Sequence, residues 1–218
     1  NDIRVLKHIV TKANQGTIKQ PYSYGKGLAL GRKYSPCSLQ SVTCATRVAC
    51  TKELLSDFDF TNAFPTILNY VFDKHGCSSP VLKEYVNDRK KFIQDLVATD
   101  PRLDYACLKK SVLVCIHNGD YKKHASGGLV IPKLSQLKTE LVSAYKEVSV
   151  KTEYATIFEA AKKRRSCGGG GDEALCDRLR PLHTIIKGNL MGTFFSYVCQ
   201  MHEEQCRSVL YNVFKRAK

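Results

Sequence analysis

The sequence predicts an α+β protein that is rich in helices and carries one small sheet. Two observations lead to this class. Apolar residues recur at helical spacing along most of the chain, for example at Leu134, Leu137, Leu141 and Tyr145. One stretch, residues 53–60, instead shows the apolar and polar alternation that is typical of a strand, and we expect it to belong to the sheet.

The first fifty residues are expected to form two helices separated by loops. In residues 2–14 the apolar side chains have helical spacing. Residues 15–37 contain four glycines and two prolines, so we expect loops and short strands there. Ser38 is in a position to cap a second helix that extends to about Thr51.

Prolines and glycines mark the helices that follow the strand. Pro65 suits the first turn of a helix that ends at Gly76. Residues 79–92 predict a second helix, because a Ser-Pro pair opens this apolar pattern. An Asp-Pro pair at residues 100 and 101 opens a third helix, which we expect to end at residues 118 and 119.

The last third of the chain is expected to be helical with one interruption. Pro132 opens one helix, and a further helix covers residues 152–165. Four consecutive glycines at 168–171 then favour a flexible loop or an engineered linker. The final helix covers residues 189–216, and its expected apolar face comprises Leu190, Phe194, Tyr197, Val198, Met201, Leu210 and Phe214.

These elements predict three regions within a chain of 218 residues. Residues 1–52 form a basic N-terminal region, and residues 53–131 form a core that contains the strand. Residues 132–218 form a helical region that a flexible glycine-rich loop interrupts at 166–172. The chain begins at Asn1 rather than at a methionine, which indicates a processed protein or a piece of a longer one.

The charge is unevenly distributed and predicts a polyanionic partner. The formal net charge is +14. Residues 1–50 carry eight Lys and Arg against one acid, residues 51–110 carry nine of each, and residues 111–218 carry seventeen against ten. Two basic flanks around a neutral middle favour binding of nucleic acid, DNA or RNA, although a solvated basic surface has the same composition. No apolar run approaches the roughly 20 residues needed to span a bilayer, so we expect no membrane partner.

The ten cysteines include no C-x-x-C pair, which argues against a zinc ribbon or a thioredoxin-like site. Since no secretory signal is evident, we interpret them as mostly reduced, buried thiols of an intracellular protein in the nucleus, cytoplasm or a viral replication site. Cys199, His202 and Cys206 share one face of the last predicted helix. A metal site there lacks an evident fourth ligand, so core packing is the preferred interpretation.

The acidic pair Asp57 and Asp59 lies in the apolar segment 56–72 and requires an explanation, because a buried carboxylate is costly unless it is paired or bound to a metal. A strand that ends in a carboxylate and turns directly into a helix can hold Mg²⁺ or Mn²⁺ over a triphosphate. The helix N-terminus adds free N–H groups for phosphate. The alternative is that Asp59 caps the helix and Asp57 is a surface residue.

The segment from Asp59 to Ile67, DFTNAFPTI, resembles the first catalytic motif of palm-fold nucleic-acid polymerases. Family B DNA polymerases have D-x-x-S-L-Y-P-S-I at this motif, and reverse transcriptases have an Asp followed five residues later by an aromatic residue. The resemblance implies that Asp59 binds the catalytic metals, with Asp57 in support. It also implies that Phe64 selects the sugar of the incoming nucleotide, with Phe60 and Asn62 beside it.

A second resemblance covers more of the chain and is to replication proteins of large DNA viruses and mobile elements. Its pattern matches here at residues 31–34 (GRKY), 38–40 (SLQ), 57–68 (DFDFTNAFPTIL) and 85–89 (YVNDR). Two departures are Phe64 in place of a histidine and Asp88 inserted before Arg89. The resemblance implies a palm-like core at residues 53–131 and a fingers-like region at residues 1–52.

Further site residues are expected from these motifs and from the charge pattern. Lys109 and Lys110 lie in an apolar helix, so one of them faces a phosphate or both extend to solvent. Asp120 is the candidate for the second catalytic carboxylate, on a hairpin turn at residues 118 and 119 or at a helix C-terminus. The expected nucleic-acid contacts, for which the alternative is solvated surface, are Arg32, Lys33, Gln40, Arg47 and Arg89.

Together these residues predict a nucleotidyltransferase segment of a viral or mobile-element replication protein. The expected partners are nucleic acid, a nucleoside triphosphate and further segments or subunits of a replication complex. The expected cofactor is Mg²⁺ or Mn²⁺. Two alternatives remain at this point. One is a non-catalytic nucleic-acid-binding module with the same charge pattern, and the other is a helical interaction domain that binds no nucleic acid.

Overall fold

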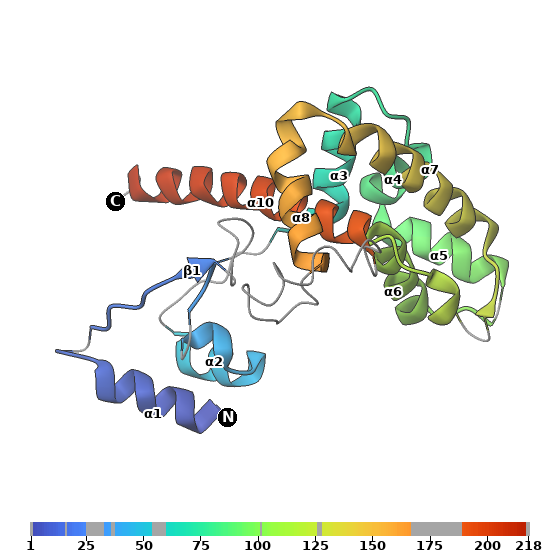
Figure 1. Ribbon diagram of the computed structural model, residues 1–218. Coiled ribbons are helices and arrows are strands. Elements are labelled where there is room, and N and C mark those ends of the chain that lie inside the picture. Colours follow the sequence, from blue (N-terminus) through green and yellow to red (C-terminus); the bar gives the residue numbers. More distant parts are fainter. Residues whose placement is uncertain are drawn as a thin grey trace. The chain divides into compact units, whose positions relative to one another are not determined.

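The computed structural model of the chain describes residues 2–15, 17–24, 33–35, 38–53, 60–100, 102–125, 128–166 and 189–216 (Figure 1). The chain divides into two compact units, residues 1–61 and residues 62–218. The described residues are predominantly helical, which confirms the α-rich class. The expected division at residues 131 and 132 falls inside the second unit.

The first unit contains two helices and one short strand pair. Its elements are α1 (Asp2–Lys12), β1 (Ser23–Tyr24), β2 (Lys33–Tyr34), the 3-10 turn η1 (Leu39–Ser41) and α2 (Cys44–Thr51). The strands are antiparallel, with Ser23 opposite Tyr34 and Tyr24 opposite Lys33. A strand was expected at residues 53–60. Residues 54–59, which include Asp57 and Asp59, lie outside the described residues, so this strand stays a prediction.

The helix expected to start after Ser38 is divided into two elements. Ser38 caps only η1, through a hydrogen bond from the Gln40 N–H to its Oγ. Thr43 caps α2 instead, and the Asp2 carboxylate accepts hydrogen bonds from the Thr43 N–H (3.1 Å), the Thr43 hydroxyl (2.7 Å) and the Thr46 hydroxyl (2.6 Å). This anchor from α1 fixes the start of α2, and the three hydrogen bonds lower the pKa of Asp2.

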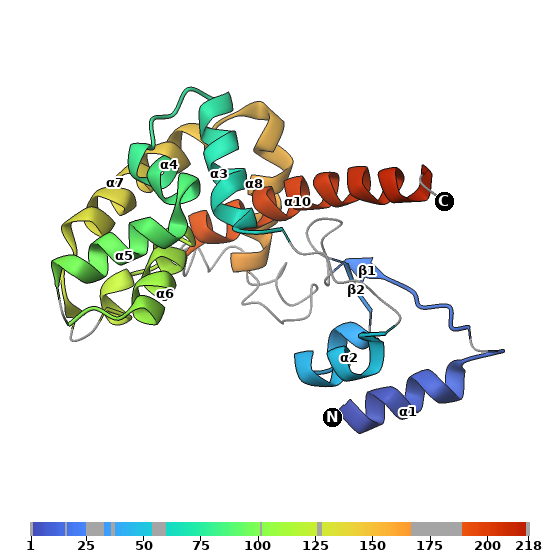
Figure 2. The same ribbon diagram turned by 180° about the vertical axis from the view of Figure 1, so that it is seen from behind.

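The second unit is a group of packed helices (Figure 1 and Figure 2). Its elements are α3 (Ala63–Lys74), α4 (Pro80–Asn87), α5 (Arg89–Thr99), α6 (Tyr105–Ile116), η2 (Tyr121–Lys123), α7 (Pro132–Ser149), η4 (Thr152–Tyr154), α8 (Ala155–Ser166) and α10 (Leu190–Arg216). In the described part of this unit no strand is found. Among all described helices, none combines the length and the apolar character needed to cross a membrane.

Aspartates rather than prolines set two of the helix boundaries, so two expectations about this unit were wrong. The helix expected over residues 79–92 breaks at Asp88, whose carboxylate accepts a hydrogen bond from the Lys91 N–H (2.9 Å) and so caps a new helix, α5. The next helix begins at Tyr105 rather than at residues 100 and 101, because the Asp104 carboxylate caps it through the N–H groups of Ala106 and Cys107.

The core of the second unit is centred on α7 and on the first half of α10. Leu134, Leu137 and Leu141 of α7 are fully buried, as predicted. The rings of Tyr145 and Phe195 stack with their centroids 4.0 Å apart. Further aromatic rings of α3 and α10 surround this pair, so one aromatic cluster joins three helices that are distant in sequence.

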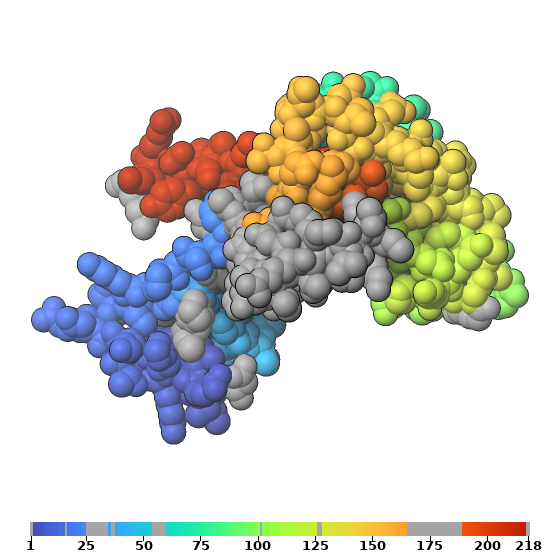
Figure 3. Space-filling model, viewed as in Figure 1, coloured from blue at the N-terminus to red at the C-terminus, as the bar shows by residue number. Residues whose placement is uncertain are grey.

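The expected apolar face of α10 is buried only in its first half. Phe194 and Val198 are buried, and so are Phe195 and Cys199. Leu210 and Phe214, which were expected on the same face, are 36% and 47% exposed. The C-terminal part of α10 extends beyond α3 and α8, and Figure 3 shows it standing clear of the surface of α8.

The described cysteines are all free thiols, and their burial only partly follows the prediction. Cys77, Cys115 and Cys199 are buried, whereas Cys44, Cys50 and Cys206 are exposed. Burial raises the pKa of the Cys115 thiol to about 12, so this thiol is protonated and unreactive at neutral pH.

Candidate functional site

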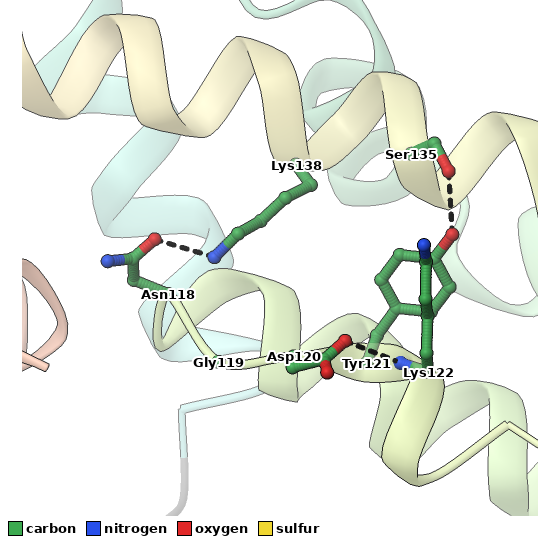
Figure 4. A pocket seen from close by; sticks show the side chains of 7 residues that line it. All are labelled: Asn118, Gly119, Asp120, Tyr121, Lys122, Ser135 and Lys138. Atoms are coloured by element: carbon green, nitrogen blue, oxygen red, sulfur yellow. Dashed lines mark hydrogen bonds between the residues drawn. The ribbon is translucent and has the colours of Figure 1, made fainter. Parts of the chain in front are cut away.

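The second unit contains a pocket of about 550 Å³ between the C-terminal end of α6, η2 and the first half of α7 (Figure 4). The residues that line it are Asn118, Gly119, Asp120, Tyr121, Lys122, Ser135 and Lys138. Its volume is within the range of small-molecule sites. The lining includes two lysines and the aspartate that the sequence analysis selected as a candidate metal ligand.

The pocket wall is built by the end of helix α6. Asn118 has a left-handed backbone (φ 56°), and the N–H of Gly119 donates to the Val114 carbonyl over 2.7 Å. A Cβ at Gly119 would lie 2.7 Å from Cγ1 and 3.1 Å from the carbonyl oxygen of Val114, so any other residue would force Val114 to shift. Residues 118 and 119 therefore form a helix C-terminus, and the alternative of a hairpin turn was wrong.

Asp120 follows this helix end and caps η2. Its Oδ1 accepts a hydrogen bond from the Lys122 N–H over 3.2 Å. In the part of the chain that the structure describes, no group of three or more His, Cys, Asp and Glu side chains is arranged to hold a metal ion. The other two expected ligands, Asp57 and Asp59, lie outside the described residues. The expected site of Mg²⁺ or Mn²⁺ thus stays a prediction.

Lys138 is the most informative side chain of the pocket. Its ammonium group is half-buried and donates to Oδ1 of Asn118 over 2.6 Å. Burial lowers the pKa of Lys138, and the charge of Asp120 partly opposes this effect. Among the described residues no carboxylate lies within ion-pair distance of Lys138. A half-buried cation whose direct partner is a neutral amide can still accept an anion as an ion-pair partner.

The start of α10 holds the end of α6 in position. The side-chain amide of Asn118 donates to Oδ1 of Asn189 over 3.0 Å, and the same oxygen accepts from the Gly192 N–H over 2.8 Å. The Asn189 amide donates in turn to the His117 carbonyl. This close approach requires Gly192, because a Cβ there would lie 2.1 Å from that carbonyl oxygen. The hydrogen bonds of Asn189 and the close approach at Gly192 therefore hold the end of α6, from which the loop with Asp120 continues.

Two of the expected nucleotide-binding residues lie at the start of α3. The ring of Phe64 packs edge-on against His117, with the centroids 5.5 Å apart. His117 directly precedes the pocket residue Asn118, and burial lowers the pKa of its imidazole. Asn62 precedes α3 in a left-handed conformation (φ 58°) and makes no capping hydrogen bond, and its buried Nδ2 has no partner among the described residues. Phe64 thus contacts His117 at the end of α6, whereas Asp120 lines the pocket that begins at Asn118.

The other expected contacts do not converge on this pocket. Lys109 and Lys110 are both exposed on α6, so neither ammonium group faces the helical core. Arg89 is the first residue of α5 and is partly buried. Phe60 belongs to the first unit. The side chain of Phe60 is partly buried. Its expected role in nucleotide binding stays a prediction.

The expected nucleic-acid contacts near the N-terminus belong to the first unit. Oε1 of Gln40 accepts a hydrogen bond from the Ser35 N–H over 3.3 Å, which ties η1 to the end of β2. Arg47 lies partly buried on α2. Lys33 is in strand β2, and Arg32 lies outside the described residues. Gln40 therefore has a local structural role in addition to any contact with nucleic acid.

Sequence reasoning missed Lys138, although the pattern contained a signal for it. The apolar stripe of α7 runs through Leu134, Leu141 and Tyr145, and Lys138 occupies the position between the first two at helical spacing. A lysine within a buried stripe either extends to solvent or faces a polar cavity. The structure places it in the second situation.

Cys199, His202 and Cys206 do not form a metal site. The Cys199 thiol is buried and contacts the carbonyl of Phe64 at 3.9 Å, whereas Cys206 is exposed. Nδ1 of His202 pairs with Oε1 of Gln205 over 3.1 Å. Core packing is confirmed for Cys199 and in part for His202, whose ring lies edge-on to Tyr70 and Tyr154 with centroids 5.9 and 6.5 Å away. The exposed Cys206 does not follow this interpretation.

Comparison of the chain with protein-family models, with curated proteins and with solved structures finds no match. The function is therefore inferred from the residues of this chain.

Proposed function

We propose that this chain binds nucleic acid, DNA or RNA, through its phosphates, as a segment of an intracellular replication protein. The observation that carries the proposal is the half-buried ammonium group of Lys138, which has no carboxylate partner among the described residues of a chain with a net charge of +14. A phosphate in the pocket would give Lys138 a direct ion-pair partner, against some repulsion from Asp120 in the same lining. Lys122 lines the same pocket, and Lys123, the next residue in the chain, is exposed.

The proposal predicts a specific loss of affinity when Lys138 is replaced. The variant K138Q keeps a hydrogen-bonding side chain but removes the charge, so we expect binding of a labelled single-stranded oligonucleotide to weaken about tenfold. The slope of log K against log salt should fall by about 0.7–0.9, as expected for one lost phosphate contact. Fluorescence anisotropy at several salt concentrations, with DNA and with RNA, measures both quantities.

The matched control is K146Q, on the same helix. Lys146 is exposed in the last turn of α7, and removing its charge should weaken binding only about twofold. Equal losses in the two variants would show that the pocket makes no special contact. Binding by the wild-type chain that does not depend on salt would overturn the proposal and favour a helical interaction domain instead.

A second candidate function is nucleotidyl transfer by a palm-type polymerase segment. It is supported by the sequence of residues 57–67 and by the packing of Phe64 against His117, which precedes the pocket residue Asn118 in the chain. In this proposal Asp59 and Asp57 hold Mg²⁺ or Mn²⁺, and Phe64 contacts the sugar of the nucleoside triphosphate. The primer 3′-hydroxyl attacks the α-phosphate, and pyrophosphate leaves.

Metal binding distinguishes the two candidates. We expect D59N to abolish Mn²⁺ binding, measured by titration calorimetry, and to leave oligonucleotide binding within about twofold. The control D95N removes an exposed carboxylate of α5 and should bind Mn²⁺ as the wild type does. If the wild-type chain binds no Mn²⁺, or if D59N binds it normally, the catalytic candidate fails while the nucleic-acid proposal stands.

A further inference from the structure

Residues 19–24 of the first unit, which we call the tyrosine segment, present two tyrosine rings to solvent. Tyr22 is 53% exposed and Tyr24 is 36% exposed, and Lys19 at the start of the segment is exposed as well. An exposed tyrosine ring leaves apolar surface in contact with water, so covering it with a flat partner is favourable. Two such rings, two residues apart in the chain, make this segment a candidate binding surface.

Hydrogen bonds hold the tyrosine segment to the rest of the first unit. The Gln20 amide donates to the hydroxyl of Ser35, which is 3% exposed. Ser35 is itself bound to η1 and its cap, since its N–H donates to Oε1 of Gln40 and its carbonyl accepts from the Ser38 hydroxyl over 3.1 Å. The pairing of β1 with β2 fixes the other end of the segment. A ligand therefore meets a backbone that is already ordered, which lowers the cost of binding.

The first unit also carries positive charge that it does not neutralise. Residues 1–50 contain eight Lys and Arg against the single acid Asp2. The Asp2 carboxylate accepts hydrogen bonds from Thr43 and Thr46 rather than from a lysine or an arginine. In the described part of this unit no lysine or arginine forms an ion pair. The exposed cations include Arg4, Lys7, Lys12 and Lys19. A partner that carries both negative charges and flat rings, as nucleic acid does, complements this unit.

The spacing of the two tyrosines suits the bases of one strand. Two residues of extended chain span at most about 7 Å. Stacked nucleotides follow one another at about 3.4 Å along a strand. Tyr22 and Tyr24 can therefore reach the same base or two neighbouring bases. Stacking requires a base with a free face, and in a duplex the neighbouring base pairs cover both faces, so this surface fits a single strand better than a duplex.

We propose that Tyr22 and Tyr24 stack on the bases of single-stranded nucleic acid, while lysines and arginines of the first unit contact its phosphates. The stacking rests on the proposed binding of nucleic acid, and it adds a second contact surface and a preference for single strands. It differs in kind from the contact at Lys138, because a ring recognises a base and an ammonium group recognises a phosphate.

The first test compares two labelled oligonucleotides of equal length, one with bases and one in which every base is absent. Both carry the same phosphates, so fluorescence anisotropy isolates the contribution of the bases. The wild-type chain should bind the strand with bases at least about tenfold more tightly. The variant Y22A with Y24A should lose this preference and bind both strands as the wild type binds the abasic one. Its slope of log K against log salt should equal that of the wild type, because neither substitution removes a charge.

Two control variants separate stacking from other effects. Y22F with Y24F keeps both rings and removes only the hydroxyls, so its affinity should stay within about twofold of the wild type. Y211A removes a tyrosine that is 66% exposed on α10 of the second unit, and it should bind as the wild type does. All variants should keep the helicity and the thermal midpoint of the wild type, because the side chains that they change are exposed.

Tyrosine emission gives a direct readout of the stacking. The chain contains eleven tyrosines and no tryptophan, so its intrinsic fluorescence comes from tyrosine. A saturating amount of the strand with bases should lower this emission in the wild type. The same amount should lower it less in Y22A with Y24A, and the abasic strand should change neither.

Three results would overturn the stacking. They are equal affinity of the wild-type chain for the two strands, a Y22A with Y24A variant that binds as the wild type does, and a Y22F with Y24F variant that loses as much affinity as the alanine variant. Equal but steeply salt-dependent binding of both strands leaves the phosphate contacts of the proposed function standing while the stacking fails. Absence of binding to either strand overturns both.

Discussion

Replacing Phe195 with alanine should lower the free energy of unfolding of the second unit by about 3–5 kcal/mol. Phe195 is 1% exposed, and its ring stacks on Tyr145 at 4.0 Å and contacts Phe194 at 4.7 Å. The removal leaves a cavity where α3, α7 and α10 meet. Since domains are typically stable by only about 5–15 kcal/mol, this loss is a large fraction of the total.

Urea unfolding followed by far-UV circular dichroism measures this loss, and the thermal midpoint should fall by about 6–20 °C. The control is Y211A, which removes an aromatic side chain that is 66% exposed on the same helix. Its effect should stay within about 0.5 kcal/mol. Similar losses in the two variants would contradict the packing of the aromatic cluster.

The second large effect is expected at Gly192, where an alanine should destabilise the protein by about 1–3 kcal/mol. The new Cβ would lie 2.1 Å from the His117 carbonyl oxygen and 2.4 Å from the Asn189 amide. A backbone carbonyl cannot rotate away as a side chain does, so α10 must move away from α6. The movement breaks the hydrogen bond between Asn118 and Asn189 and loosens one wall of the pocket.

Whether G192A raises or lowers the free energy of unfolding is the measurement that tests this close approach. On helix propensity alone, a change from glycine to alanine inside a helix stabilises by about 1 kcal/mol. A G192A variant that is more stable than the wild type would therefore contradict the close approach of α10 to α6. A less stable variant should also bind oligonucleotide more weakly, because Lys138 donates to the same Asn118.

Helices of the second unit were the most predictable part of the fold, because local signals determine their positions. Pro132 and the leucines of α7 marked a helix whose apolar side is buried as expected. At Asp88 the signal was also local but was overlooked. A single aspartate that can cap a new helix is enough to divide an apolar stripe that otherwise continues.

Other errors came from contacts between residues that are distant in sequence. Ser38 and Thr43 are both good caps, and the Asp2 carboxylate stabilises the start of α2 at Thr43. Phe195 was missed because its neighbour Phe194 already occupied the predicted face. Both are buried since α3 and α8 cover α10 from two sides. An apolar face predicted from periodicity alone assumes that other elements cover the helix on only one side.

The candidate site was predictable in its parts but not in its assembly. Phe64 and Asp120 were selected from motifs, and in the structure Phe64 contacts His117 while Asp120 lines the adjoining pocket. Lys138 was missed because a lysine in an apolar stripe usually extends to solvent. The metal ligands Asp57 and Asp59 stay a prediction, because they lie outside the described residues.

The packing of α10 on α3 has a consequence for the synthesis of the protein. Leu68, Val71 and Phe72 of α3 are buried in the finished unit, partly by a helix that begins about 116 residues after the end of α3. At roughly 5–20 residues per second, a ribosome needs about 6–23 s to reach α10. During that time the apolar side of α3 is without its final cover, and this is the interval in which a nascent chain is most exposed to chaperones and to aggregation.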